Sequence, residues 1–156
     1  MQRRSVLIAG LSLVHAPWVR AHHGWSSFDQ ARPLYLEGRA AKVVWRNPHV
    51  EFDLEVAPDL KLPADLATRS VPAQSSPVEG AKLLASAQLP TRKDRIWHIE
   101  LAPLTRMQAW KVEEIKPGAP VSVLGFTFAA EQGDAVLRAE YLFVAGKTYA
   151  MRSSPA

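Results

Sequence analysis

Three histidines carry the clearest chemical potential in this sequence: the adjacent His22 and His23, and His49 at the end of the stretch Arg46-Asn47-Pro48-His49. His22 directly follows Ala21, and the small residues before it resemble an A-x-A-like signal-peptidase site. A chain that begins at His22 presents an α-amine with a pKa of about 8 and an imidazole with a pKa of about 6.5. Both nitrogens are easily deprotonated at neutral pH, so this single residue could give a metal two ligands.

A third nitrogen from His23 or His49 would complete the T-shaped set known as a histidine brace, which suits copper, the strongest binder among the divalent ions. If the cut instead follows Arg20, the chain begins Ala21-His22-His23. The amine, two backbone amides and the third-position imidazole then form a square-planar site for copper or nickel. Both starts favour the same metal class, and we predict a copper site that uses His22, His23 and His49.

Residues 1–21 have the three parts of an export signal: a basic start, an apolar run over 5–14 and a helix-breaking stretch before the cut. The apolar run is too short to span about 30 Å of hydrocarbon. The pair Arg3-Arg4 also fits a twin-arginine signal, although basic pairs are common in ordinary secretory signals. We therefore expect a periplasmic or secreted protein with no integral membrane span after cleavage.

The charge balance changes once the signal is removed. The full chain has 19 Lys and Arg against 15 Asp and Glu, a net charge of +4. Three arginines and no acid lie in residues 1–21, which leaves 16 basic and 15 acidic residues in the mature chain. A pI near 9.6 is thus no evidence for nucleic-acid binding. The chain contains no cysteine, which excludes disulfides and thiolate sites.

Strand patterns dominate residues 22–156, which we expect to form one domain. The stretch 34–45 alternates, but its apolar parity slips near Ala40-Ala41, which predicts a bulge or bend of the kind that closes barrels. Clean alternation over 50–56 and 95–101 predicts two further strands. The Pro-, Ala- and Ser-rich insertion at about 58–93 separates them, with a short helix within 76–89. We expect it to be a solvated excursion and assign it no function.

Residues 104–115 space apolar side chains three apart and predict a short amphipathic helix. Two strands follow, joined by a turn at 131–134, and 147–152 can add another. Five to six strands, with a helix between the third and fourth, indicate a small OB-like Greek-key barrel. A β-sandwich is the alternative, although it would want about seven evenly spaced strands.

These segments resemble a family of small exported bacterial proteins classed as a domain of unknown function. The resemblance covers nearly all of the chain after the signal except the insertion. It is carried by His22, His23, Phe28, Asp29, Trp45, Asn47, Pro48, His49, Trp97, Glu100, Lys116, Pro117 and Gly118. Gly24 replaces the serine usual there, and the insertion is longer than the expected turn. The resemblance implies a fold and a compartment but no activity.

Two function classes remain. The first is a non-enzymatic exported protein that handles copper, since the chain has no G-x-S-x-G elbow, glycine-rich phosphate loop or His-paired cysteine. The second is a metal-free module that binds a small ligand or an envelope protein over the second and third strands. That face presents Glu51, Asp53, Glu55 and Glu100, with His98 expected near Glu51 or Asp53. Its acids would repel phosphate and disfavour oligonucleotides.

The copper hypothesis makes one demand on the fold. His49 lies beyond the far end of the first strand, about 12 residues at 3.3 Å each if that strand were straight. We therefore expect residues 22–29 to run back alongside the strand, with 29–33 as the reversal. The alternative is a frayed, solvated terminus and a histidine that simply occupies a turn.

Overall fold

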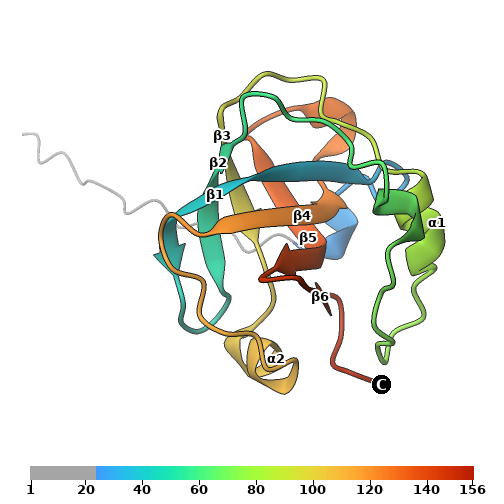
Figure 1. The fold of residues 1–156 in the computed structure, drawn as a ribbon, viewed down its shortest axis with the longest axis vertical. Helices are drawn as coiled ribbons and strands as arrows, with labels where there is room; N and C mark the ends of the chain where they lie inside the picture. Colours follow the sequence, from blue (N-terminus) through green and yellow to red (C-terminus); the bar gives the residue numbers. More distant parts are fainter. Residues whose placement is uncertain (1–23) are drawn as a thin grey trace, which may run out of the picture.

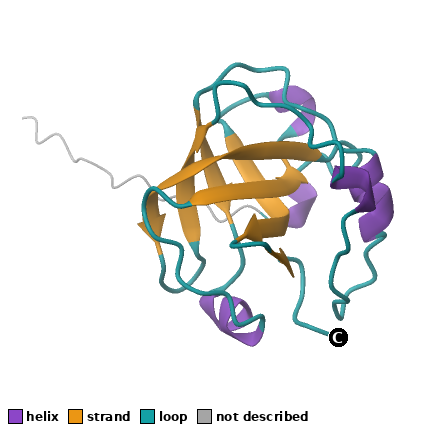
Figure 2. Cartoon of the chain, in the orientation of Figure 1, coloured by secondary structure: helices purple, strands orange, loops and turns teal. Residues whose placement is uncertain are grey.

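The computed structural model describes residues 24–156 as a β-structure with only short helices (Figures 1 and 2). The strands are β1 (Leu34–Val44), β2 (Glu51–Val56), β3 (Ile96–Glu100), β4 (Pro120–Phe126), β5 (Val136–Val144) and β6 (Lys147–Ala150). The helices are α1 (Gly80–Ala85) and α2 (Leu104–Ala109), with 3-10 turns η1 (Trp25–Ser27), η2 (Leu66–Thr68) and η3 (Ala129–Glu131). Within these residues, no helix has the length and apolarity needed to cross a membrane.

Strands β1 to β5 form a closed barrel. β1 pairs with β2 and β4, β2 pairs with β3, and β4 pairs with β5, all antiparallel. A parallel pairing between β3 and β5 closes the barrel, and β6 extends it from β5. With α2 placed between β3 and β4 (Figure 1), this is the connectivity of an OB-like Greek-key barrel. The predicted fold class is confirmed, and the sandwich alternative is not the architecture.

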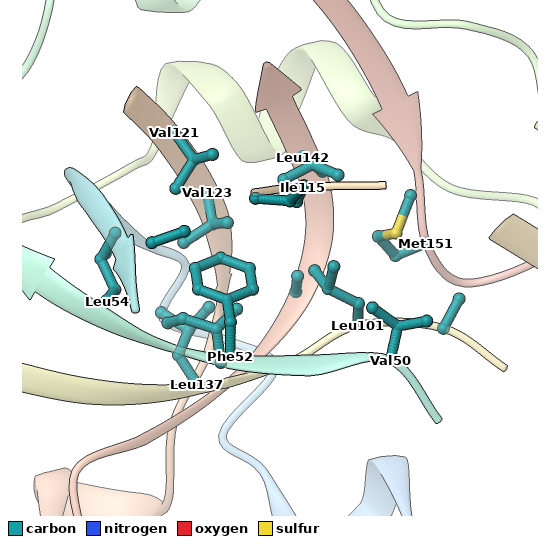
Figure 3. Packing of buried hydrophobic residues seen from close by; sticks show 14 of the residues in the cluster. Val50, Phe52, Leu54, Leu101, Ile115, Val121, Val123, Leu137, Leu142 and Met151 are labelled. Atoms are coloured by element: carbon teal, nitrogen blue, oxygen red, sulfur yellow. The ribbon is translucent and has the colours of Figure 1, made fainter. Parts of the chain in front are cut away.

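The barrel interior is filled by the alternating side chains of its strands. Val50, Phe52 and Leu54 are fully buried, as are Trp97 and Ile99 on β3. Figure 3 shows the Phe52 ring among side chains contributed by β4 and β5. Burying each of these side chains contributes about 1.5–3 kcal/mol. The period-2 patterns of both strands therefore predicted the correct inward faces.

A bulge bends β1 close to the place where the apolar parity slips. The register with β2 shifts between Ala41 and Val44, and Lys42 has a φ of 44°. Earlier in the same strand, Gly38 lies so close to β2 that a Cβ there would overlap the Glu55 carbonyl oxygen. β1 can therefore wrap around the barrel because it has a bulge at one point and no side chain at another.

Helix α2 is shorter than the predicted 104–115. It ends at Ala109, and the chain turns at Lys111, which has a φ of 53°. Val112 and Ile115 then pack into the core without helical backbone. The apolar spacing that continues past Ala109 thus reflects burial of an irregular segment rather than further helical turns.

The segment 58–93 packs against the outside of the barrel. Much of it is exposed, but Leu66 and Leu84 are buried at 3% and 2% exposure. They join a second apolar cluster with Tyr35 on β1 and with Tyr141 and Phe143 on β5. The expectation of a solvated excursion therefore holds only in part, because the outer face of β1 and β5 beneath this segment is apolar and is buried by it.

Glu131 fixes the far end of this segment. Its carboxylate accepts hydrogen bonds from the backbone N–H groups of Thr91 and Arg92 and from the Arg32 guanidinium. Burial raises the pKa of this carboxyl, but the hydrogen bonds outweigh burial and hold the pKa below its usual range. Glu131, predicted to lie in a hairpin turn, is thus buried with only 7% of its surface exposed, and it anchors the end of this segment.

We expect Gly38→Ala to lower the free energy of unfolding by about 1–3 kcal/mol, because the added methyl must push β1 away from β2. Gly24→Ala is the matched control, since that glycine has extended backbone and its nearest neighbour would lie at 3.9 Å. Urea denaturation of both variants measures the difference. Equal stability of the two variants would contradict the close approach at Gly38.

Candidate functional site

The predicted metal ligands divide between two parts of the chain. His22 and His23, like the predicted signal, lie outside the described residues. His49 lies in the loop between β1 and β2, half-buried, with its Nδ1 shielded from solvent. A metal at this side chain would therefore be bound through Nε2. In residues 24–156 no three His, Asp or Glu side chains are grouped so as to hold a metal ion, so a site of the predicted kind depends on nitrogens from positions 22 and 23.

One row of backbone pairings explains how the two ends of β1 are related. From Leu34 on β1 the row passes to Gly125 on β4 and then to Ala139 on β5. From Arg138, the neighbour of Ala139, it continues to Glu100 on β3, to Glu51 on β2 and back to Val44 on β1. The row leaves β1 at Leu34 and returns to it at Val44, ten positions later. This stagger is the shear that a closed barrel requires. It brings the start of β1 and the loop after its end to the same level of the barrel.

The chain before β1 lies across the end of β4. The backbone N–H of Asp29 donates to the Thr127 carbonyl at 2.8 Å, and the Phe28 and Phe128 rings stack with their centroids 5.1 Å apart. Trp25 meets Phe126 edge to face, 6.3 Å between centroids. The expectation that residues 22–29 run back alongside the first strand is therefore wrong for 24–29, because barrel shear already shortens the path.

Trp25 is held between two arginines. Its ring lies 4.0 Å from the guanidinium carbon of Arg152 and 5.4 Å from that of Arg138. Burial lowers the pKa of Arg138, which stays cationic and pairs with Glu100 at 3.3 Å. Cation–π contacts of this kind contribute about 0.5–2 kcal/mol each. We call Trp25, Arg138 and Arg152 the N-terminal clasp, since they fix the chain two residues after His23.

A buried carboxylate binds one arginine of the clasp. Arg152 donates from Nε to Glu140 at 2.7 Å, and the amide of Gln74 donates to the other carboxylate oxygen at 3.2 Å. Glu140 is fully buried on β5, and burial raises its pKa while Arg152 opposes that rise. Gln74 belongs to the segment 58–93. The clasp thus depends on three parts of the chain that are remote in sequence.

The outer face of β2 and β3 carries the predicted histidine–carboxylate contacts. His98 lies 3.3 Å from Glu51 through Nε2 and 3.3 Å from Asp53 through Nδ1. Lys42 pairs with the second oxygen of Asp53 at 3.1 Å. The expected approach of His98 to both acids is confirmed. Glu51 and Asp53 therefore have partners within the chain, while Glu55 on the same face of β2 is exposed.

The sequence did not reveal the clasp. Trp25 belongs to no motif, and Arg138 and Arg152 lie in predicted strands without a motif. Their proximity follows from barrel closure and from the path of the C-terminal segment, which bridges Gln74 at Pro155 (Figure 1). Neither can be read from local spacing.

The fold defines this protein as a small all-β barrel of the OB type. Residues 11–61 match DUF6152, a family of unknown function. That range includes positions 22, 23 and 49 together with β1 and β2. No curated protein and no solved structure matches the chain significantly. The similarity therefore gives a relationship to that family over these residues and brings no activity with it.

Arg152→Ala should destabilise the fold by about 3 kcal/mol at neutral pH, because it leaves the buried Glu140 carboxylate without a cationic partner. The loss should shrink as the pH falls, since burial raises the pKa of Glu140 and protonation then removes the buried charge. Chemical denaturation at pH 7.5 and pH 5 measures both values. The double variant Glu140→Gln/Arg152→Ala should recover most of the stability at pH 7.5; a loss that is independent of pH would contradict this account.

Proposed function

We propose that this is an exported, non-enzymatic protein that binds one copper ion through its mature N-terminus and His49. The observation that carries the proposal is the N-terminal clasp. Trp25 is fixed over Arg138, on the side of the barrel where β5, β3 and β2 lead to the His49 loop. The first residues of the mature chain would therefore start from a fixed point near the third ligand.

The spacing favours this arrangement. Glu51 lies two strand spacings from Arg138, about 10 Å, and His49 is two residues beyond Glu51. His22 is three residues before Trp25, a stretch that spans at most about 10 Å. Two imidazole side chains extend this reach further. A common metal position for His22 and His49 is thus compatible with the length of chain available.

The donor set suits copper better than the other metals of a periplasm. An α-amine and neutral imidazoles are nitrogen ligands, which copper binds more strongly than the neighbouring divalent ions do. The sequence has no cysteine, and residues 24–156 contain no group of carboxylates placed to hold a metal ion, so the ligands that would select zinc or calcium are missing there. Copper bound here would take its amine and imidazole from His22 and its third nitrogen from His49 or His23.

Cleavage after Arg20 would give a related copper site that takes its ligands from different residues. Ala21-His22-His23 would then bind the metal in a square plane without His49. The two forms make different demands on residue 49, which allows them to be separated experimentally.

Copper titration followed by native mass spectrometry tests the proposal on protein exported by its own signal. We expect a mature mass that begins at His22 and one tightly bound copper. His22→Ala, or a one-residue N-terminal extension, should abolish stoichiometric binding while the circular dichroism spectrum stays unchanged, because each removes a nitrogen from the set. His49→Ala should weaken binding at least 10-fold.

His98→Ala is the matched control, since it removes a histidine whose ring is occupied by Glu51 and Asp53. It should bind copper like the unaltered protein. Tight binding that tolerates His49→Ala but not His23→Ala would assign the square-planar form. Unchanged affinity in the extended protein would overturn copper binding at the terminus and leave the metal-free module as the function.

A further inference from the structure

A large groove opens at the opposite end of β5 from the N-terminal clasp. Its volume is about 1020 Å³, at the upper end of the roughly 300–1,000 Å³ typical of small-ligand sites. The strands β1 and β4 and the hairpin of β5 and β6 form its floor. Residues 65–70 of the segment 58–93 form one wall, so part of this insertion shapes a cavity.

The floor carries a carboxylate with a fixed orientation. Glu37 accepts a hydrogen bond of 2.6 Å from the hydroxyl of Tyr35, which is 1% exposed. Burial and the neighbouring Glu37 raise the pKa of Tyr35 to about 12, so its hydroxyl remains a donor at any physiological pH. Ser122 lies beside Glu37 in the β1–β4 register. A half-buried anion held in this way favours a cationic group or strong donor on a ligand.

The wall contributes an arginine whose charge is already balanced. Arg69 lies over the Phe143 ring at 5.1 Å and makes two hydrogen bonds to Asp65, at 3.0 and 3.2 Å. Asp65 raises the pKa of Arg69 and so stabilises this pair. Arg69 therefore closes the groove over Phe143 as part of an ion pair and is a poor anion site.

The remaining cations lie at the rim. Arg39, Arg95 and Lys147 line the groove and are exposed to solvent. An anionic group of a ligand would meet these side chains while a cationic group meets Glu37 on the floor. Glu55 is a further exposed acid of the lining, so the mouth carries three cations and one acid besides the Arg69–Asp65 pair, and Glu37 supplies the negative charge of the base.

We infer that this groove binds a short peptide that carries a basic side chain. Lysine or arginine of the peptide pairs with Glu37, and its carboxylate lies among the rim cations. Thr148 offers a hydroxyl to the peptide backbone. A phosphate-rich ligand would meet the Glu37 carboxylate, and an acyl chain would have to cover this charged floor, so both fit worse. This site needs no metal and does not rest on the copper proposal.

Titration of the mature protein with the tripeptides Ala-Lys-Ala and Ala-Glu-Ala, followed by amide NMR, tests the inference. Ala-Lys-Ala should shift the amides of Gly38, Ser122 and Thr148 and saturate, whereas Ala-Glu-Ala should not. Glu37→Gln should weaken binding of Ala-Lys-Ala at least 10-fold. Glu113→Gln, at an exposed acid outside the groove, is the matched control and should have no effect.

A second variant keeps the test sharp if Glu37→Gln disturbs the hydrogen bond from Tyr35. Lys147→Glu changes only an exposed side chain of the rim, and it should weaken Ala-Lys-Ala more than the same peptide with an amidated C-terminus. Absence of saturable shifts with Ala-Lys-Ala at millimolar concentration would overturn the inference. Equal binding of both tripeptides would also overturn it, because Glu37 would then have no part in recognition.

Discussion

The parallel pairing of β3 with β5 is the constraint on which the rest of the structure depends. Without it, β1 to β5 would be an open sheet whose first strand has two distant ends. Closure with a stagger of ten residues along β1 brings Leu34 and Val44 into one row. The bulge at Lys42 and the missing side chain at Gly38 let β1 follow the required curve. The meeting of the start of β1 with the loop after its end follows from that closure.

Both faces of β5 are covered, and its two ends contribute to different sites. β5 is buried along nearly its whole length, with Leu137 and Leu142 inside and Tyr141 and Phe143 under the segment 58–93. At its beginning, Arg138 meets Trp25. At its end, Phe143 lies in the groove. β5 thus contributes to the N-terminal clasp at one end and to the groove at the other, and the two sites are not in contact.

Local periodicity predicted only the features that depend on the alternation of side chains along a strand. The inward faces of β2 and β3 and the meeting of His98 with Glu51 and Asp53 follow from a period of two and an antiparallel register. The sequence placed Glu131 in a turn and did not predict its anchoring role, since its partners at Thr91 and Arg92 are about forty residues away. The clasp and the apolar packing around Leu66 also join residues that are far apart in the sequence, so local patterns did not predict them. Each of these depends on how the barrel closes, which local spacing does not encode.

Ordering the backbone at Trp25 has an entropic cost that the contacts of its ring must offset. A terminus normally frays, because ordering its backbone costs about 1–2 kcal/mol per residue. Here two cations stack on one ring, and one of them also compensates a buried carboxylate. The contacts of Arg138 and Arg152 with Trp25 order the chain just before β1, which lowers the entropic cost of placing the residues before it. Anchoring of this kind is useful to a protein whose first residues must hold a ligand in a defined geometry.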